Sequence, residues 1–171
     1  EFTFEKKDIA RAAGIAATAS QPNSPIPVLR CVRITMKDGI ARFTGANAEV
    51  AITQSCPYSG PDFDMVVDGV ALAKFAQSAP KDTVKIKCDD LRVTLSSGRS
   101  RLSIGTQDAA SFPTLSNPEG ETKIDVAALR RAIDLTRYAM GSGKGHEMLQ
   151  GLCLRSDGDG QVLANATDGK I

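Results

Sequence analysis

The sequence predicts an α+β fold made of repeated β-α-β-β-β units, two per domain, with helices packed on antiparallel sheets. Three observations support this prediction. An alternating strand runs into an alanine-rich amphipathic helix at 1–15, and the pattern returns at 62–76, where Phe63 corresponds to Phe2 at an offset of 61 residues. A second offset, of 120 residues, aligns LRCVRI with LQGLCL. Tight-turn signals also separate the short strands. The chain therefore holds about two and a half copies of one unit.

The first copy of the unit can be divided into elements by its local patterns. A short strand leads into the amphipathic helix, and the proline-rich loop SQPNSPIP follows. The Asp-Gly pair of KDG favours a tight hairpin between the next two strands, because these residues tolerate positive φ. The predicted elements are strand 1–5, helix 8–19, and strands 28–36, 40–46 and 48–54.

The second copy repeats this order and completes a domain. It consists of strand 62–67, helix 69–78 and a meander of DTVKIKC, LRVTLSS and RSRLSIGT. Two units make a domain of ordinary size at 1–115, with a linker rich in Pro, Asn and Gly at 116–121. A partial second domain is expected at 122–171. Because LANATDGKI corresponds to the interior of the first copy, we expect the chain to be a fragment that stops within its third copy.

Composition excludes several classes of protein. The formal net charge is +1, which predicts no particular partner, although charges can still be sorted onto separate faces. The four cysteines are widely spaced, which favours free thiols in a reducing cytosol over a disulfide scaffold. No apolar run approaches the roughly 20 residues that span a bilayer. We expect a cytoplasmic protein with no membrane association.

No catalytic set or cofactor motif emerges from the sequence. The single histidine, His146, lies in a glycine-rich loop without an orienting partner nearby. GSGKG lacks the earlier Gly and the following Ser or Thr of a phosphate-binding loop, so it is interpreted as a helix-to-strand connection whose Lys144 can still touch a phosphate. SDGDG lacks the Glu of a calcium loop and is interpreted as a hairpin turn. We expect no enzyme, no cofactor and no metal site.

A net basic helix face is the main functional signal. In VAALRRAIDLTRYAM the apolar stripe consists of Leu129, Ala132, Ile133, Thr136 and Met140. Arg130, Arg131 and Arg137 lie off this stripe, with only Asp134 opposing them. Two interpretations stay open: an ordinary solvated face, or a face that lies against phosphates without reading bases.

An ordered set of motifs resembles one family over the whole chain. SPIPVLRCVRI, DGIARFTGANAEVAI, SGRSRLSI, FPTL and ATDGK, in this order and spacing, resemble the bacterial sliding DNA clamp, the β subunit of DNA polymerase III. The resemblance implies a chain of three similar domains, two chains of which close head to tail into a ring around duplex DNA. The helices would line the hole, and the sheets would form the outer wall.

The resemblance also implies which residues face DNA. The hole-facing helices correspond to 8–19, 69–78 and 126–140. Two loops, SQPNSPIP and GSGKGHE, resemble loops that touch DNA, and in each of them a residue departs from the arginine that is common in the family. The implied DNA-facing residues are Asn23, Lys74, Arg130, Arg131, Arg137, Lys144 and His146.

Two protein contacts are implied as well. SRLSIG matches an edge strand that pairs with the other subunit, so Leu102 and Ile104 would be its apolar contacts; burial in the domain's own core is the alternative. A groove that captures short peptides of polymerases and the clamp loader would be formed on this side by Leu149, Thr167, Gly169 and Lys170, while Ile171 stands where the family usually has Arg.

We therefore expect a processivity factor that encircles double-stranded DNA independently of sequence and tethers a polymerase, not an enzyme. Weak phosphate contacts would let such a ring slide, whereas strong base contacts would stop it. Two alternatives are kept: a clamp-derived DNA-binding or regulatory protein that closes no ring, and an unrelated hydrolase on a repeated α+β scaffold.

Overall fold

The chain forms two compact units in the computed structural model, Glu1–Ser116 and Asn117–Ile171. The structure describes residues 1–47, 49–89, 91–113, 124–142, 147–156 and 161–170. The predicted linker, 116–121, lies outside the described residues. Each unit is therefore considered by itself.

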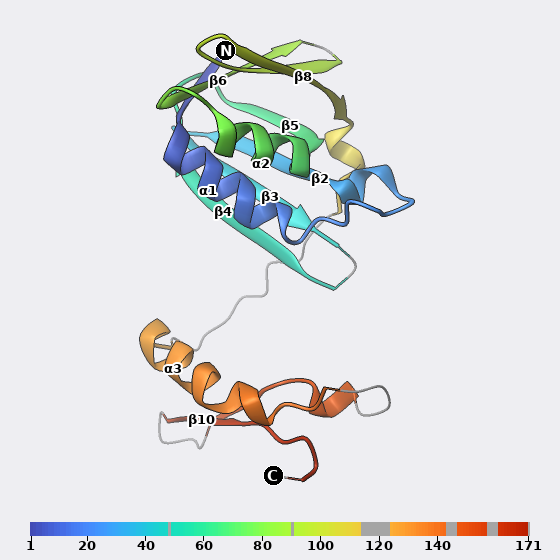
Figure 1. Cartoon of the computed structure of the whole chain (residues 1–171), viewed down its shortest axis with the longest axis vertical. Helices are drawn as coiled ribbons and strands as arrows, with labels where there is room; N and C mark the ends of the chain where they lie inside the picture. Colours follow the sequence, from blue (N-terminus) through green and yellow to red (C-terminus); the bar gives the residue numbers. More distant parts are fainter. Residues whose placement is uncertain (48, 90, 114–123, 143–146, 157–160, 171) are drawn as a thin grey trace. The chain divides into compact units, whose positions relative to one another are not determined.

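The first unit contains two successive β-α-β-β-β repeats, as predicted (Figure 1). The first repeat comprises β1 (Phe2–Glu5), α1 (Lys6–Ala17), the short 3-10 helix η1 (Pro27–Arg30), β2 (Cys31–Lys37), β3 (Ile40–Ala46) and β4 (Ala51–Pro57). The second comprises β5 (Phe63–Asp68), α2 (Gly69–Ser78), β6 (Thr83–Asp89), β7 (Arg92–Ser97), β8 (Ser100–Gln107) and the 3-10 helix η2 (Ala109–Ser111).

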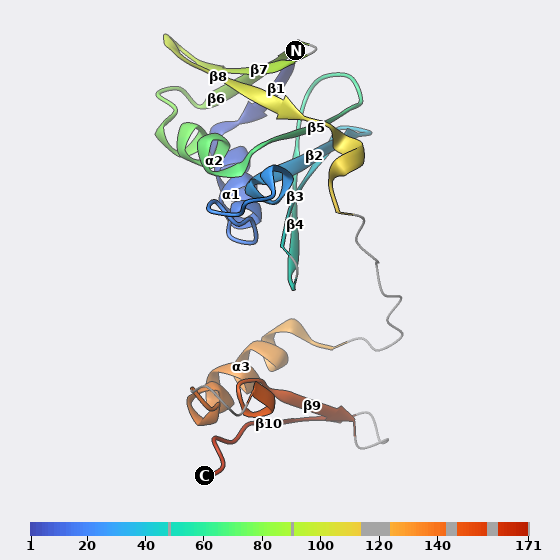
Figure 2. The same ribbon diagram turned by 90° about the vertical axis from the view of Figure 1, so that its right-hand side faces the viewer.

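The strands of the first unit join into one antiparallel sheet of eight. Its order is β1-β6-β7-β8-β5-β2-β3-β4, and the two halves meet where β5 pairs with the end of β8. A bridge between Thr3 and Ser59 links the outer edges, with N–O distances of 2.8 and 2.9 Å. The bridge closes the strand order into a circuit. If β1, β2, β3 and β4 are exchanged with β5, β6, β7 and β8, the order of strands around this circuit stays the same. The halves lie at an angle, with both helices on the inner side (Figure 2).

Strand pairing corrects the offset between the repeats from 61 to 63 residues. Ile34 of β2 and Ile86 of β6 are equivalent, because each lies three residues before the end of its hairpin strand. Phe2 pairs with Ile86, and Met65 pairs with Ile34, so Phe2 corresponds to Met65. The helices agree, because the buried residues Ile9, Ala12, Ala13 and Ala16 of α1 then correspond to buried residues of the second repeat, Leu72, Phe75 and Ala76 of α2 and Ala79 directly after it. Two phenylalanines at the shorter offset had favoured the wrong register.

Small residues let the helices approach the sheet. The core is filled by large side chains that are fully buried, including Phe4, Ile34, Phe43, Leu72, Ile86 and Leu95. Against them α1 presents alanines, and Gly45 of β3 lies directly beneath the helix, where an added Cβ would come within 1.9 Å of the carbonyl oxygen of Ala16. Only glycine permits this contact.

The boundaries of three predicted elements shift for local reasons. The strand predicted at 28–36 begins at Cys31, because Pro27 starts the 3-10 turn η1. The helix predicted at 8–19 starts directly after β1 at Lys6 and ends at Ala17. The strand predicted at 48–54 starts at Ala51, because the Asn47 side chain accepts hydrogen bonds from the N–H groups of Glu49 and Val50 and extends the turn.

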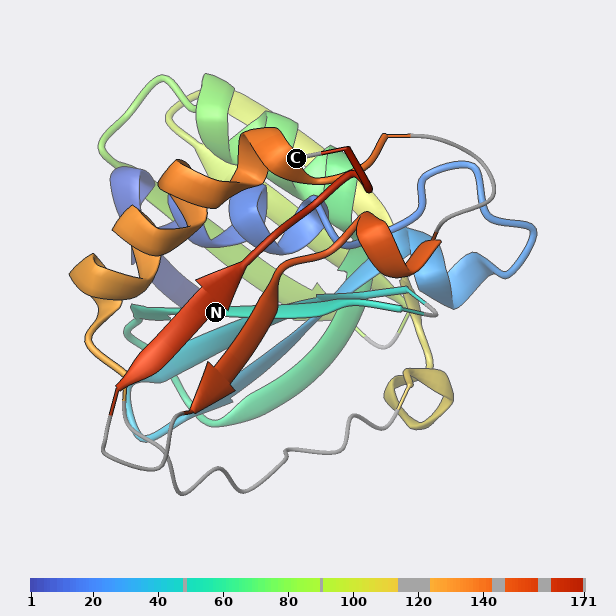
Figure 3. The ribbon, with the colours of Figure 1, turned by 90° about the horizontal axis from the view of Figure 1, so that it is seen from below.

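The second unit repeats the start of the first. It contains α3 (Val126–Thr136), the 3-10 helices η3 (Arg137–Ala139) and η4 (Glu147–Leu149), and a hairpin of β9 (Cys153–Ser156) and β10 (Val162–Asn165), with α3 beside the hairpin (Figure 3). Asp125 caps α3 by accepting from the N–H of Ala128 at 2.8 Å. The offset of 120 residues extends to single bonds: the N–H of Gln21 donates to the Leu29 carbonyl at 2.7 Å, and that of Gly141 donates to the Leu149 carbonyl at 2.7 Å.

In the described part of the chain, no helix is long and apolar enough to span a bilayer.

Candidate nucleic-acid interface

The outer face of the helices in the first unit is basic. α1 and α2 lie side by side and bury their apolar faces against the sheet, so their opposite faces point to solvent (Figures 1 and 2). Every exposed charged side chain of these two helices is a cation: Lys7 and Arg11 on α1, and Lys74 on α2. We call these three residues the helix-face cations.

The one acidic residue of α1 and α2 is less exposed than these cations. Asp8 is only partly exposed and lies near the buried Cys56 of β4. Burial, together with the negative charge of Asp8, raises the pKa of the Cys56 thiol to about 12. The carboxylate therefore does not neutralise the outer face.

Three arginines of the second unit, Arg130 and Arg131 of α3 and Arg137 at the start of η3, are here called the α3 arginines. Arg130, Arg131 and Arg137 are all exposed. Asp134 lies 4.0 Å from Arg130 and 3.9 Å from Arg137, and such long, exposed ion pairs contribute little. Arg131, which the sequence allowed to pair with Asp134 or Asp125, makes no ion pair with another described residue. All three guanidinium groups are therefore accessible.

The predicted apolar stripe of α3 faces the hairpin. Leu129 and Ala132 line a small hollow of about 220 Å³ together with Leu154, Val162 and Ala164 of β9 and β10. Ile133 departs from the prediction, because 40% of it is exposed.

The loop that follows α1 places Asn23 at an exposed turn. The turn is held by the bond from Ser24 N–H to the Gln21 carbonyl. Arg30 is also exposed, and its Nε donates to the Ser24 carbonyl at 2.7 Å. A cation from η1 is therefore tied to the loop that contains Asn23. The corresponding residues of the second unit, Lys144 and His146, lie outside the described residues.

The predicted subunit edge has one open side along most of its length. β8 pairs with β7 from Ser97–Ser100 to Arg92–Gly105, but with β5 only through Thr106 and Gln107. Leu102 and Ile104 are partly exposed and also pack against the core. Beside them, Ala71, Lys74, Phe75 and Ser78 of α2 line a cleft of about 420 Å³ with Arg101 and Leu102.

The predicted peptide groove gathers three of its four residues. Leu149 and Thr167 line a hollow of about 330 Å³, and an added Cβ at Gly169 would lie 3.6 Å from Leu149 Cδ1. Gly169 has φ +87°, which favours glycine, and its N–H donates to Thr167 Oγ1 at 3.0 Å. Lys170 is exposed, and its N–H donates to Asp168. Ile171 lies outside the described residues.

Comparison with known proteins identifies the family. The sequence profile of the DNA polymerase III beta subunit, N-terminal domain, matches residues 1–116. The chain belongs to this family.

Beta sliding clamps are similar to nearly the whole chain. That of Pseudomonas aeruginosa is 26% identical over 173 residues, covering 98% of this chain and 47% of the relative. That of Escherichia coli K12 is 23% identical over 175 residues, covering 99% of this chain and 47% of the relative. The chain thus spans about half the length of the curated relatives that it matches.

Solved clamp structures share the fold. The crystal structure of a DnaN sliding clamp from Pseudomonas aeruginosa superposes with a TM-score of 0.90 at 25% identity, covering 98% of this chain and 47% of that one. Caulobacter crescentus pol III beta superposes with a TM-score of 0.86 at 23% identity, over 98% of this chain and 47% of that one. The α+β clamp fold expected from the sequence is confirmed.

Four residues at these surfaces were missed by sequence reasoning. Lys7 and Arg11 lie outside the apolar positions of their helix. The same spacing was used to find the cations of α3 but was not applied to α1. Arg30 lies next to a predicted strand, and its tie to the loop was not visible in the sequence. Met148, which is 94% exposed, lines the hollow beside Leu149.

Proposed function

We propose that this chain forms part of a DNA sliding clamp, a non-catalytic processivity factor that encircles duplex DNA and tethers a polymerase in the bacterial cytoplasm. One observation carries the proposal: in a member of the clamp family, every exposed charge on α1 and α2 is positive. The helix-face cations and the three α3 arginines supply flexible charges that attract phosphates along any sequence.

This surface suits sliding better than sequence recognition. Lys7, Arg11 and Lys74 are long, exposed side chains on smooth helix faces. Their contacts with phosphates would exchange easily as the duplex moves, because each is worth little alone and carries no base information. Retention on DNA would then come from enclosure by the ring.

Ring closure would use the open side of β8. The unpaired backbone groups beside Leu102 and Ile104 invite an added strand. We propose that another clamp subunit supplies that strand. The hollow around Leu149 and Thr167 would in turn hold part of an apolar peptide from a polymerase or clamp loader.

The proposal is tested with the full-length product of the gene that encodes this chain. The protein is loaded by a clamp loader onto nicked circular DNA, and its retention is measured by gel filtration in high salt. A clamp stays on the circle and leaves when the DNA is cut to a linear form, because its hold is topological.

Salt-resistant retention that is lost on linearisation supports the clamp. Binding to circular and linear DNA that is equal and lost in high salt would instead indicate a clamp-derived DNA-binding protein that closes no ring. That outcome would overturn the proposal.

A further inference from the structure

The two halves of the sheet, β1-β6-β7-β8 and β5-β2-β3-β4, meet at two equivalent seams, and an aromatic ring fills one of them. At the β1–β4 seam, Tyr58 is 7% exposed and stacks on Phe4 with ring centres 6.0 Å apart. Its hydroxyl donates to the Pro61 carbonyl and to Asp62 Oδ1, each at 3.2 Å. This residue follows the last residue of β4.

Strand pairing shows which residue occupies the same position at the β5–β8 seam. Ile40 pairs with Pro57 in the first repeat, and the equivalent pair in the second is Arg92 with Gly105. The next residues along the chain, Tyr58 and Thr106, are therefore equivalent. The seam bridges agree, because Ser59 pairs with Thr3, and Gln107 pairs with Val66.

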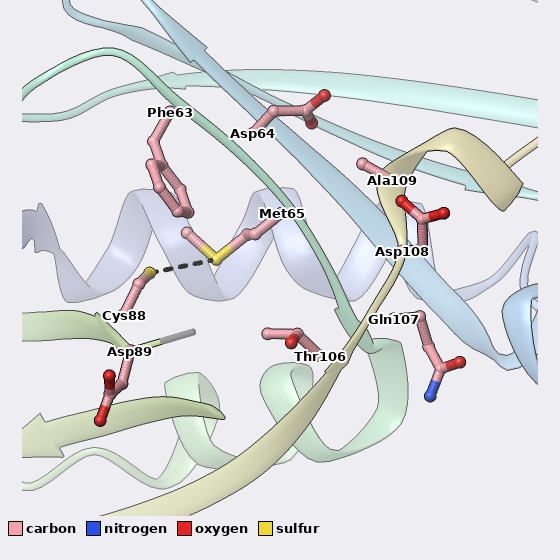
Figure 4. Close-up of a pocket in the computed structure, with 9 residues that line it drawn as sticks. All are labelled: Phe63, Asp64, Met65, Cys88, Asp89, Thr106, Gln107, Asp108 and Ala109. Atoms are coloured by element: carbon pink, nitrogen blue, oxygen red, sulfur yellow. Dashed lines mark hydrogen bonds between the residues drawn. The ribbon is translucent and has the colours of Figure 1, made fainter. Parts of the chain in front are cut away.

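A cavity of about 430 Å³ lies where the second repeat has threonine in place of tyrosine (Figure 4). Met65, the counterpart of Phe2, and Cys88 approach one another in it, with their sulfur atoms 3.9 Å apart. Phe63 and Thr106 add further lining, and Ala109, the counterpart of Pro61, borders it. The cavity therefore combines an apolar surface with a backbone turn like the one that receives the Tyr58 hydroxyl.

The rim of the cavity is acidic. Asp64, Asp89 and Asp108 border it, and Asp64 forms an ion pair with Arg33 at 2.6 Å. Repulsion from these carboxylates disfavours an anionic occupant such as a phosphorylated ring.

We propose that the β5–β8 seam cavity binds the side chain of an unphosphorylated tyrosine on an extended segment of a partner protein. The first repeat supplies the template, because Tyr58 reaches its own seam from the end of a strand. Sulfur and aromatic groups on the wall suit a ring, since thioethers and rings attract one another. This site lies in the first unit and does not depend on the hollow around Leu149.

The test uses p-cresol, the isolated side chain of tyrosine, with the 171-residue chain. Titration followed by ¹H–¹⁵N NMR should shift the amide signals of Met65, Val66 and Gln107, with a dissociation constant of about 1 mM. Toluene, which lacks the hydroxyl, should bind roughly threefold more weakly. 4-Methylphenyl phosphate should not bind. N-acetyl-tyrosine amide should bind as p-cresol does, which shows that the site accepts the ring on a polypeptide backbone.

Two variants separate the cavity from other surfaces. Thr106→Tyr restores the ring of the first repeat and should weaken p-cresol binding by about tenfold or more. Thr94→Tyr places the same side chain on β7 outside the cavity and should leave binding unchanged. If Thr106→Tyr does not fold, nuclear Overhauser contacts between the p-cresol ring and the Met65 methyl group decide the matter in the unaltered chain.

Binding that is lost in Thr106→Tyr and kept in Thr94→Tyr supports the site. Four outcomes would each overturn it. The Overhauser contacts to Met65 could be absent, or the phosphate ester could bind as well as p-cresol. The tyrosine amide could fail to bind although p-cresol binds, or a folded Thr106→Tyr variant could bind p-cresol unchanged.

Discussion

At the scale of single residues, close packing between α1 and β3 places the strictest demand. Gly45 is fully enclosed beneath Ala16, whereas Gly105 of β8 has no atom within 4 Å of an added Cβ. The chain therefore contains two strand glycines with opposite surroundings.

We predict that Gly45→Ala destabilises the first unit by about 3 kcal/mol, since either the helix or the strand must move to relieve the overlap. Gly105→Ala is the matched control and should change the free energy of unfolding by less than about 0.5 kcal/mol. Urea unfolding followed by circular dichroism measures both. Equal effects would show that α1 yields easily.

The cysteines differ in environment and should differ in reactivity. Burial raises the pKa of the Cys31 thiol to about 11 and that of Cys56 to about 12. At pH 8 only about one Cys56 thiol in ten thousand would be ionised, and the thiolate is the reactive form. Cys153 is exposed on β9.

Iodoacetamide at pH 8 should therefore alkylate Cys153 first and leave Cys31 and Cys56 unmodified in the folded chain. Peptide mass spectrometry over time identifies the modified residues, with urea-unfolded chain as the control in which all of them react. Early labelling of Cys56 in folded protein would contradict the packing of β4 against α1.

At the scale of elements, the sequence was most informative where period and turn chemistry coincide. Helix 69–78 was predicted with the bounds that α2 has, and in the structure Asp68 caps it by accepting a hydrogen bond from the N–H of Ala71 at 2.7 Å. The start of β2 was not predictable, since VLR before Cys31 is as apolar as a strand, yet the chain turns after Pro27. The cations of α1 were overlooked because the amphipathic spacing that was analysed for α3 was not analysed for α1.

The α3 arginines give a prediction at this scale. Replacing Arg130, Arg131 and Arg137 with alanine in the full-length protein should lower the slope of log binding constant against log salt by about 0.9 per lost phosphate contact, equally for any DNA sequence. Fluorescence anisotropy at several salt concentrations measures the slope.

The matched control removes the same number of cations from the outer face of the sheet: Arg42, Lys87 and Arg92. These side chains are exposed, and each lies next to a residue of its strand that is buried in the core, so they point away from the core. Their loss should leave the slope unchanged. A slope that falls equally in both triple variants would mean that DNA binding reflects total charge and not the helix faces.

At the scale of the whole molecule, the repeats were predictable but their union was not. Period and spacing indicated two units of one design, while the two units are joined by long-range contacts, because β1 pairs with β6 and β2 pairs with β5. The candidate surfaces follow the same division. The basic helix faces could be predicted from amphipathic spacing, whereas the cavity at Thr106 depends on how β5, β6 and β8 come together within the second repeat.

Stability of the whole molecule should fall in alkali. The folded-state pKa values of Cys31 and Cys56, about 11 and 12, exceed the ordinary value of 9.0, so the native chain holds these protons more tightly than the unfolded chain. Their contribution is complete below pH 9 and is lost as the pH rises through 11 and 12. The raised pKa of Tyr58, caused first by burial, acts in the same direction.

Urea midpoints between pH 8 and 11 should therefore decline, and less steeply in Cys31→Ala/Cys56→Ala than in the unaltered chain. Cys153→Ala should follow the unaltered profile. An identical decline in the double variant would assign the loss to other groups.

The exchange of β1–β4 for β5–β8 leaves the circuit of strands unchanged, which is the symmetry of two identical partners. In a dimer of two identical repeats every substitution would occur twice, so Tyr58 would occupy both seams. Because the two repeats are joined in one chain, a residue can change in one repeat alone. The first repeat therefore keeps Tyr58, which fills its seam permanently. The second repeat has Thr106 instead and has an open cavity at its seam, and this change leaves the packing of the first seam unaffected.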